Sequence, residues 1–304
     1  MKKKSAPALK STFNIAHYLK SQKEFVDSYL ANFLPPLHTD PKSLHEAMHY
    51  SVFAGGKRIR PILILATGEA LQMDKNNLVH LACAVELIHT YSLIHDDLPS
   101  MDNDDYRRGQ LTTHKKFGEG MAVLTGNALL THALKKLSEI PSTPKRPSLV
   151  HELCHAIGSQ NGMLAGQAMD LETQGKRFSK EHLEQIHSAK TGALIQSSIY
   201  CAGLIAGTSQ KILDNLSSFG CKLGLAYQIV DDILDIEGSS SELGKTAGKD
   251  SVHEKATYPA LYGLKASKQF AMDLVNQAIH QIHDLGPPSK TLVELARFIS
   301  VRRF

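Results

Sequence analysis

Two groups of aspartates in this sequence have the residue types and the spacing that could hold metal ions. In the first group, Asp96 and Asp97 end an apolar helical run that begins near Leu78. Pro99 cannot continue the helical hydrogen bonding, and Asp102 follows in the loop. Adjacent carboxylates are unfavourable at the negative C-terminal end of a helix dipole, so cations are their natural partners. A single turn of this kind is equally typical of a solvated acidic loop.

The pattern recurs at the end of a second apolar run, over about 212–236. Asp231 and Asp235 lie about 40° apart on one helix face, and Gly224, Tyr227 and Gln228 share that stripe. Two such helix ends can face each other across a cavity. Carboxylates with no neighbouring Cys or His ligands favour Mg²⁺, which proteins usually hold together with substrate phosphates. The two groups therefore predict a diphosphate substrate.

A glycine-rich basic loop, Gly55-Gly56-Lys57-Arg58-Ile59-Arg60-Pro61, lies upstream of the first acidic group. Its glycines permit close backbone approach, and Lys57 and Arg60 are one helical turn apart, so we expect them to converge on one anion. It lacks the Walker A pattern. Alone, such a loop is more often a basic surface turn; beside the acidic groups it favours a phosphate clamp.

Further cationic and polar residues flank these motifs. His89 and Ser92 share the helix face of Asp96, although a packed core histidine is the ordinary alternative, and Arg107 and Arg108 follow the first acidic group. Lys190 and Thr191 interrupt an apolar stretch, where the lysine either points into the cavity or extends to solvent. The Gly- and Lys-rich segment with Lys245 and Lys255 is predicted to close over the bound diphosphate. No role is assigned to the terminal Arg302-Arg303-Phe304.

A competing motif lies in the middle of the chain. His151-Glu152-Leu153-Cys154-His155 matches H-E-x-x-H, which places two histidines on one helix face in zinc hydrolases. The match is short, and no third ligand is evident, although Glu172 or Glu181 is a candidate. We keep the zinc site as a remote alternative.

Composition bounds the class of protein. The 304 residues are 42% hydrophobic without tryptophan, and the net charge of +4 is too small to favour nucleic acid binding. We expect the cysteines to be reduced and packed, as in a cytoplasmic protein; they are Cys83, Cys154, Cys201 and Cys221. The basic start is followed by no apolar segment, so we expect no signal peptide, and no run is long enough to span a membrane.

Apolar residues recur at three- and four-residue spacing along nearly the whole chain, which predicts a single all-α domain over residues 1–304. No segment reads as a strand. The expected helices are 12–33, 42–54, 60–71, 77–98, 120–138, 148–172, 180–187, 190–206, 210–236, 256–284 and 290–300.

Taken together, these motifs resemble the trans-isoprenyl diphosphate synthases, and most closely the bacterial farnesyl diphosphate synthases. Over about residues 50–260 the chain has, in the family's order, GGKRIRP, LIHDDLPSMDNDDYRRG, GQAMDL, KTGALI, YQIVDDILD and LGKTAGKD. The resemblance implies a helical bundle around a deep central cavity, a homodimer, and three Mg²⁺ ions. The implied substrates are isopentenyl diphosphate and the allylic diphosphates.

The resemblance also implies roles for individual residues. Asp96, Asp102 and Asp231 match positions that hold Mg²⁺, supported by Asp97 and Asp235. Positions that bind the allylic diphosphate match Arg107, Lys190, Thr191, Gln228, Lys245 and Lys255. Positions that bind isopentenyl diphosphate match Lys57, Arg60, His89 and Arg108. Asn127 stands where the family usually has aspartate, so an ion pair at that position is in doubt.

The implied reaction is ionisation of the allylic diphosphate, followed by attack of the isopentenyl double bond and loss of a proton. The backbone carbonyls of Lys190 and Thr191 and the amide oxygen of Gln228 could stabilise the allylic cation. Product length should depend on the side chains just before Asp96, namely Tyr91 and Ser92. A bulky residue there goes with the fifteen-carbon product.

Three alternatives remain beside a farnesyl diphosphate synthase and the zinc hydrolase. The same chemistry stopping at twenty carbons would make a geranylgeranyl diphosphate synthase. A non-catalytic partner subunit would not need the intact carboxylates and Lys190. A terpene cyclase would not need the clamp formed by Lys57 and Arg60.

Overall fold

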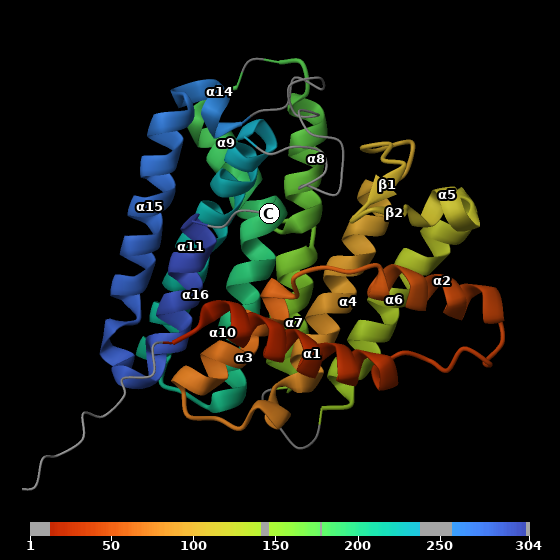
Figure 1. Cartoon of the computed structure of the whole chain (residues 1–304), viewed down its shortest axis with the longest axis horizontal. Helices are drawn as coiled ribbons and strands as arrows, with labels where there is room; N and C mark the ends of the chain where they lie inside the picture. The colour runs from red at the N-terminus through yellow and green to blue at the C-terminus, as the bar shows by residue number, and fades with distance from the viewer. Residues whose placement is uncertain (1–12, 141–145, 177, 238–256, 302–304) are drawn as a thin grey trace, which may run out of the picture.

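The computed structural model describes residues 13–140, 146–176, 178–237 and 257–301, and in these ranges the fold is all-α, as predicted. Its first half comprises α1 (Ile15–Phe33), α2 (Lys42–Phe53), α3 (Ile59–Ala70), η1 (Lys75–Asn77), α4 (Val79–Asp96), α5 (Thr113–Phe117) and α6 (Glu119–Ser138). Its second half comprises α7 (Arg146–Ile157), α8 (Met163–Thr173), α9 (Lys180–His187), η2 (Ser188–Gly192), α10 (Ala193–Ala206), α11 (Gln210–Glu237), α14 (Tyr258–Tyr262), α15 (Leu264–Gln281), η3 (His283–Leu285), η4 (Pro287–Ser289) and α16 (Lys290–Val301). Figure 1 shows these helices.

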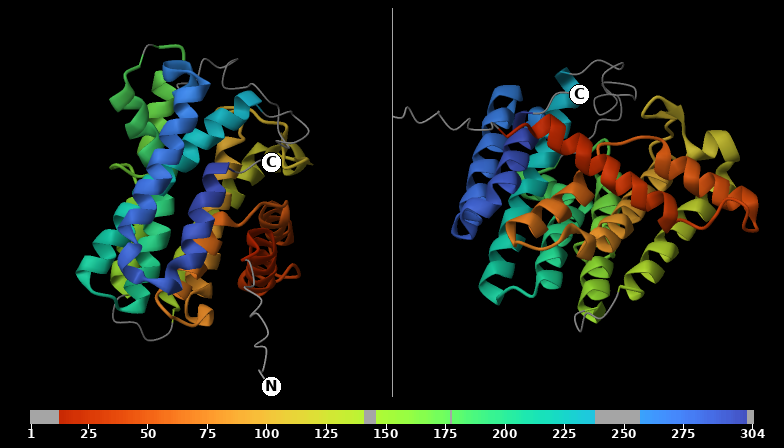
Figure 2. Two further views of the ribbon diagram at one scale, coloured as in Figure 1. Left: turned by 60° about the vertical axis from the view of Figure 1, so that its left-hand side comes forward. Right: turned by 60° about the horizontal axis from the view of Figure 1, so that its bottom comes forward.

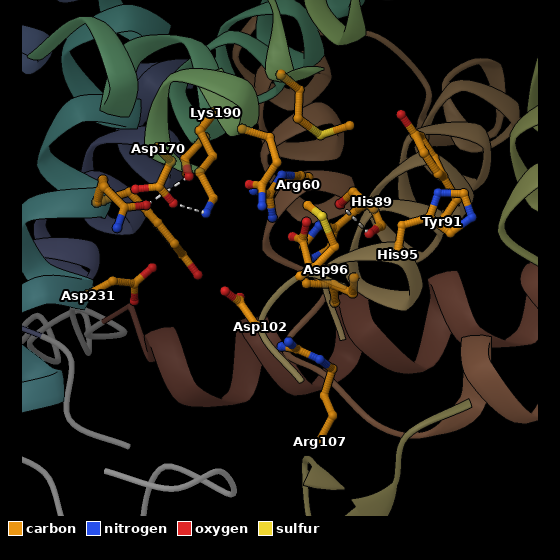
Figure 3. A pocket seen from close by; sticks show the side chains of 18 of the residues that line it. Arg60, His89, Tyr91, His95, Asp96, Asp102, Arg107, Asp170, Lys190 and Asp231 are labelled. Carbon is orange, nitrogen blue, oxygen red and sulfur yellow. Dashed lines mark hydrogen bonds and ion pairs between the residues drawn. The ribbon is translucent and has the colours of Figure 1, made fainter. Parts of the chain in front are cut away.

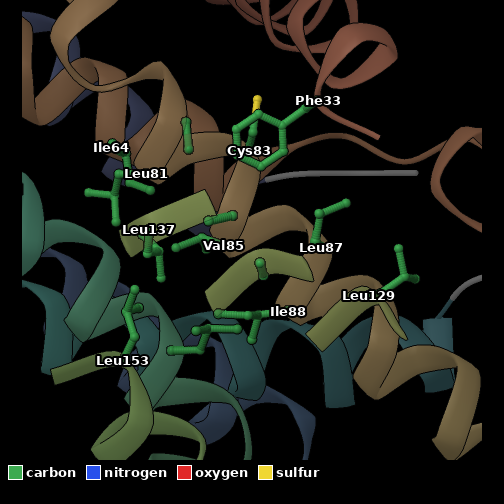
Figure 4. Packing of buried hydrophobic residues seen from close by; sticks show 14 of the residues in the cluster. Phe33, Ile64, Leu81, Cys83, Val85, Leu87, Ile88, Leu129, Leu137 and Leu153 are labelled. Carbon is green, nitrogen blue, oxygen red and sulfur yellow. The ribbon is translucent and has the colours of Figure 1, made fainter. Parts of the chain in front are cut away.

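Helix α4 is the central element of one half of the bundle. Residues 81–88 are all buried, so this helix is surrounded on every side, as an apolar helix without a polar face must be. Its side chains pack against α1, α3, α6 and α10, and Figure 4 shows Leu81, Val85 and Ile88 within the buried cluster. The helix ends at Asp96, close to Pro99 as predicted. Packing therefore fixes the first acidic group at the end of a rigid element.

Helix α11 occupies the corresponding place in the other half. Leu216, Phe219 and Leu223 are buried, and α11 packs against α10, α15 and α16. Helices α15 and α16 flank α11 on the side of the bundle away from α6 (Figures 1 and 2). The second acidic group lies near the C-terminal end of this helix.

A π-helical turn, η2, joins α9 to α10 and contains Lys190 and Thr191. Close backbone approach holds it on two sides. A Cβ at Gly166 of α8 would lie 2.2 Å from the backbone nitrogen of Lys190, and a Cβ at Gly224 of α11 would lie 2.7 Å from the Cα of Gly192. Glycine at these positions lets both helices contact the turn directly. Sequence periodicity predicted two separate helices here, because a π turn has no simple pattern of its own.

Other boundaries also differ from the prediction. The helix expected over 148–172 is divided into α7 and α8, and Gly158 and Gly162 lie between them, with a Cβ at Gly162 only 2.6 Å from the Gly158 nitrogen. The helix expected over 256–284 is broken at Gly263, whose φ is +76°. A two-stranded hairpin was missed: β1 (Tyr106–Arg107) pairs with β2 (Gln110–Leu111). Gly263 breaks its helix through its positive φ, Gly162 permits a close approach to Gly158, and a short turn forms the hairpin.

The cysteine prediction is correct for half of the set. Cys83 and Cys201 are buried, whereas Cys154 and Cys221 are exposed on their helices, and all four are free thiols. Helical periodicity placed them in apolar runs but misjudged which face two of them occupy. Among the described helices, none combines the length and the apolar character required to cross a membrane.

We predict that Gly224→Ala destabilises the protein by roughly 1–3 kcal/mol, because the added methyl group would overlap the Gly192 backbone. Chemical denaturation measures the change. Gly120→Ala is the matched control, since an added Cβ at Gly120 of α6 would have no atom within 4 Å, and we expect it to be neutral or slightly stabilising. Equal stability of the two variants would contradict the close contact between η2 and α11.

Candidate active site

A cavity of about 1000 Å³ lies between the ends of α4 and α11, with further walls from α3, α8 and η2. Within the described ranges, every predicted site residue except Asp97 lines it. They are Lys57, Arg60, His89, Tyr91, Ser92, Asp96, Asp102, Arg107, Arg108, Lys190, Thr191, Gln228, Asp231 and Asp235. Lys245, Lys255 and Arg302-Arg303-Phe304 lie outside the described residues. Residues far apart in sequence thus share one cavity.

The two acidic groups face each other across this space. The backbone N–H of Asp102 donates to the Asp96 carbonyl oxygen at 2.9 Å, so the loop after α4 folds back as predicted. Figure 3 shows the side chains of Asp102 and Asp231 directed toward each other from opposite walls. Burial raises the pKa of the Asp96 carboxyl group to about 6; Lys190 opposes the shift and Asp102 adds to it. This carboxylate is therefore held where a cation would stabilise it.

These carboxylates fit Mg²⁺ only in part. Their hard oxygen atoms suit the ion. Among the described residues, however, no three Asp, Glu, His or Cys side chains lie close enough together to hold a metal ion by themselves. Phosphate oxygens of a bound substrate would have to complete the coordination, which is the usual arrangement for Mg²⁺ at such sites.

Asp97 occupies a different place from the one predicted. Its side chain is buried and accepts hydrogen bonds from the Nε of Arg107 at 2.8 and 2.9 Å, while the Nη2 of Arg107 lies 2.5 Å away. Asp104 lies 3.8 Å from the same nitrogen. Asp97 thus orients Arg107, which lines the cavity, instead of facing the cavity itself. Helix position alone did not distinguish it from Asp96, because the two residues are adjacent.

A basic wall lies next to the first acidic group. It contains Lys57, Arg60, His89 and Arg108. Burial lowers the pKa of His89 well below its usual value, and the nearby guanidinium groups of Arg60, Arg108 and Arg107 lower it further. His89 is therefore neutral, and the positive charge around it comes from the arginines. Such a concentration of positive charge along one wall is suited to an anion.

The basic loop differs from the expected helical turn. Lys57 precedes α3 and is exposed, while Arg60 lies inside α3 and is buried. Arg108 donates to the carbonyl oxygen of Gly55, and a Cβ at Gly56 would lie 2.5 Å from the Arg108 guanidinium group. With its φ of +118°, Gly56 is required both for the backbone conformation and for the space that Arg108 fills.

Polar residues of η2 and α11 form a chain of hydrogen bonds on the opposite wall. The Thr191 hydroxyl donates to the Gln228 amide oxygen at 2.7 Å, and the Gln228 amide nitrogen donates to Asp232 at 3.0 Å. The Lys190 ammonium lies 2.6 Å from Asp170 (Figure 3). Although burial lowers the pKa of Lys190, Asp170 and Asp96 outweigh it and raise this pKa overall. Lys190 is therefore a permanent cation in the cavity.

Sequence reasoning missed Asp170 and Asp232 as site residues. Asp170 belongs to the GQAMDL motif that was recognised, but no helical spacing relates it to Lys190. Asp232 is buried within the second acidic motif, where it also accepts a hydrogen bond from the Tyr258 N–H at 3.1 Å. The position of Asp232 within the second acidic motif could have indicated a site residue. The ion pair between Asp170 and Lys190 is visible only in the tertiary structure.

The proposed chain-length residues lie away from the second acidic group. Tyr91 is buried, with 4% of its surface exposed, and its ring contacts His95 edge-on at 5.6 Å. Figure 3 shows both rings at the end of the cavity away from Asp231. The Ser92 hydroxyl donates to the His89 carbonyl oxygen at 2.9 Å. Tyr91 reaches the cavity wall although it lies off the helix face of Asp96.

Two remaining sequence features lie outside this cavity. His151 and His155 are exposed on α7, and no described Asp, Glu, His or Cys completes a three-residue metal cluster with them. Asn127 is exposed on α6, where its backbone carbonyl accepts a hydrogen bond from Thr131 at 2.9 Å. Neither feature lines the site.

We predict that Asp96→Asn raises the melting temperature at pH 7.5 in metal-free buffer. A carboxyl group whose pKa is raised in the folded state contributes stability below its unfolded pKa of about 4, and that stability is lost as the pH rises through about 6. The ionised group is therefore unfavourable at pH 7.5, and asparagine removes that cost.

Thermal unfolding between pH 5 and 7.5 checks this prediction. The difference between variant and wild type should shrink toward pH 5, where wild-type Asp96 is protonated. Asp214→Asn, on the exposed side of α11, is the control for the same substitution outside the cavity and should not raise the melting temperature at pH 7.5. A variant no more stable than wild type at pH 7.5 would show that Asp96 is not under electrostatic strain.

Comparison with known proteins agrees with this geometry. The family model described as polyprenyl synthetase matches residues 41–286. The farnesyl diphosphate synthase of Geobacillus stearothermophilus is 43% identical over 95% of this chain and 98% of its own. A heterodimeric geranylgeranyl pyrophosphate synthase large subunit of Arabidopsis thaliana is also 43% identical, over 96% of this chain and 81% of its own.

A solved structure extends the likeness to the fold. The geranyltransferase of Helicobacter pylori, crystallised with magnesium and isoprenyl diphosphate, superposes with a TM-score of 0.79 at 31% identity, over 95% of this chain and 97% of that one. The resemblance inferred from the motifs is confirmed: this chain belongs to the polyprenyl synthetase family of prenyltransferases.

Proposed function

We propose that this protein condenses isopentenyl diphosphate head-to-tail with dimethylallyl and then geranyl diphosphate, giving farnesyl diphosphate. The observation that carries the proposal is the joint placement of two opposed carboxylate groups and a basic wall in one cavity of about 1000 Å³. That arrangement offers separate places for two diphosphates, one beside the carboxylates and one beside the arginines. The family membership supports the reaction class.

The allylic diphosphate is assigned to the space between the acidic groups. Asp96, Asp102 and Asp231 would hold Mg²⁺ there, with Asp235 in support. When bound, Mg²⁺ would neutralise charge on the diphosphate and make it a better leaving group. Lys190, kept cationic by its surroundings, adds a fixed positive charge for the same diphosphate.

Arg107 supplies the second fixed cation for the allylic diphosphate. Asp97 holds its guanidinium group through the hydrogen bonds described above. In this proposal Asp97 acts through Arg107 and not as a direct ligand of Mg²⁺. Preorganised charges of this kind favour the developing negative charge as the C–O bond breaks and its electron pair leaves with the diphosphate.

Isopentenyl diphosphate is assigned to the basic wall, where Lys57, Arg60, His89 and Arg108 surround one space. Its double bond supplies the electron pair for the new C–C bond to the allylic carbon. The resulting cation then loses a proton, and the departed diphosphate is the base that the family resemblance implies. No side chain of this wall needs to take part in the bond changes.

The hydrogen-bonded wall of η2 and α11 would face the allylic cation. The Gln228 amide oxygen accepts one hydrogen bond from Thr191, and a carbonyl oxygen can accept two interactions. Because Asp232 fixes the amide nitrogen, the oxygen is held in this orientation. An oriented dipole can stabilise the cation without reacting with it.

Product length is assigned to the end of the cavity away from the second acidic group. Buried Tyr91, backed by His95, is the candidate for the floor of the cavity and favours fifteen carbons. Relatives with equal identity are named as synthases of farnesyl and of geranylgeranyl products, so twenty carbons is the second candidate. We also propose a homodimer, on the family resemblance alone.

A product assay tests the proposal. Purified protein is incubated with Mg²⁺, isopentenyl diphosphate and dimethylallyl diphosphate, and the dephosphorylated products are sized by chromatography. A fifteen-carbon alcohol is the expected product. A twenty-carbon alcohol would keep the reaction and overturn the length, and folded protein without any condensation would favour the non-catalytic partner subunit.

We predict that Asp231→Ala and Asp96→Ala each lower the condensation rate by about 10²-fold or more, because each removes charge that organises the leaving diphosphate. Steady-state kinetics at saturating Mg²⁺ measures the loss. Asp273→Ala, exposed on α15 away from the cavity, is the control and should retain wild-type rates. Unchanged rates in either aspartate variant would remove that residue from the site.

We predict that Tyr91→Ala lengthens the product distribution relative to wild type, since it removes a buried ring from the cavity wall. Chromatography of the dephosphorylated products checks this. Tyr106→Ala is the matched control because Tyr106 is 57% exposed and does not line the cavity. An unchanged distribution with Tyr91→Ala would show that another residue forms the floor.

A further inference from the structure

Arg58 lies in the middle of the basic loop but was given no role by the sequence motifs. It is 3% exposed, and each of its three guanidinium nitrogens already donates a hydrogen bond. Nε donates to Asp27 of α1 at 2.8 Å, Nη1 to Glu86 of α4 at 2.7 Å, and Nη2 to the Val52 carbonyl oxygen at 2.7 Å. The Arg58 guanidinium group is therefore bound by groups of the protein itself.

The backbone at Arg58 is unusual for its residue type. Its φ of 54° and ψ of 36° place it in the left-handed region, which is unfavourable for a non-glycine residue. Arg58 is also the N-cap residue directly before α3, and its carbonyl oxygen accepts from the Ile62 N–H at 3.0 Å. The side-chain hydrogen bonds hold the chain in this conformation, so the direction of α3 depends on them.

The neighbours of Arg58 are the residues assigned to isopentenyl diphosphate. Lys57 precedes it directly, and Arg60 follows it by two positions. On α4, Glu86 lies one helical turn before His89. Burial lowers the pKa of Arg108, and the Glu86 carboxylate opposes that shift. The pair of Arg58 and Glu86 thus joins the basic loop to α4, which carries His89, and Glu86 acts electrostatically on Arg108.

We propose that Arg58, held by Glu86 and Asp27, is a positioning residue for the isopentenyl diphosphate subsite, through which helix α1 contributes to the binding of that substrate. The inference rests on the proposed function. Loss of either carboxylate leaves a buried guanidinium group without one of its partners, which is strongly unfavourable. Arg58 then changes conformation, and the loop no longer presents Lys57 and Arg60 to the same anion.

A purely electrostatic role for Glu86 predicts the opposite effect of Glu86→Gln on diphosphate binding, so the two explanations can be separated. Glu86 is the acidic group that most strongly opposes the lowered pKa of Arg108 in the basic wall. If Glu86 acted only through its charge, Glu86→Gln would make the wall more positive and tighten binding of a diphosphate. If Glu86 acts by holding Arg58, the same substitution weakens binding.

Titration calorimetry with isopentenyl diphosphate alone separates these outcomes, because this substrate cannot react without an allylic partner. We expect Glu86→Gln to raise its Kd about tenfold and Asp27→Asn about threefold, as expected for losing a hydrogen bond to a charged group. Glu86→Asp should recover part of the affinity. Steady-state kinetics should show KM raised for isopentenyl diphosphate and nearly unchanged for the allylic diphosphate.

Glu24→Gln, exposed on α1, is the matched control and should bind as wild type does. Tighter or unchanged binding by Glu86→Gln and Asp27→Asn would overturn the inference, and so would KM values that rise equally for both substrates. If Glu86→Gln fails to fold, the partly exposed position of Asp27 keeps the Asp27→Asn test available. Absence of binding by the wild type would instead refute the proposed function.

Discussion

Burial of many charged groups in one cavity is the constraint on which this structure depends. A charge removed from water must find a partner, and the cost of leaving it alone exceeds the contribution of most packing interactions. The protein meets this requirement internally for some groups, by pairing Arg107 with Asp97 and Lys190 with Asp170. For Asp96, burial instead raises the pKa to about 6, and a cation brought by the substrate is the remaining compensation.

The helical framework determines which charges meet. Helix α4 is buried on all sides, so the first acidic group cannot shift without disturbing the core. The π turn is held between α8 and α11 by contacts that only glycine permits at Gly166 and Gly224. These contacts set the distance between Lys190 and the carboxylates. Rigid elements with short functional segments at their ends are well suited to a reaction that needs fixed charges.

Much of the fold was predictable because helical periodicity is a strong signal in apolar sequences. The end of α4 near Pro99 and the placement of both acidic groups followed from spacing alone. The break at Gly263 was missed, since a glycine ends a helix only when its surroundings favour another backbone conformation. The break between α7 and α8 was missed because it depends on the close approach of Gly162 to Gly158, which periodicity does not reveal. The π turn and the short hairpin left no periodic trace.

The site was predictable at the level of residues that line the cavity, because recognised motifs supplied them. The ion pairs between side chains of the site could not be predicted from the motifs. Asp97, expected to support Mg²⁺, is bound to Arg107 instead, and the contact between Asp170 and Lys190 joins α8 to η2. Arg58 was given no role because the helical spacing singled out Lys57 and Arg60, and spacing does not reveal that the Arg58 side chain points toward α1 and α4. The partner of each of these charged side chains depends on tertiary neighbours that no local sequence pattern encodes.

The central claim is that metal and diphosphate bind together, since no three described ligands hold a metal ion unaided. Calorimetric titration of inorganic pyrophosphate, with and without Mg²⁺, tests it most directly. Pyrophosphate should bind at least about tenfold more tightly with Mg²⁺, and by linkage Mg²⁺ should bind more tightly with pyrophosphate. Equal pyrophosphate affinity under both conditions would contradict the account.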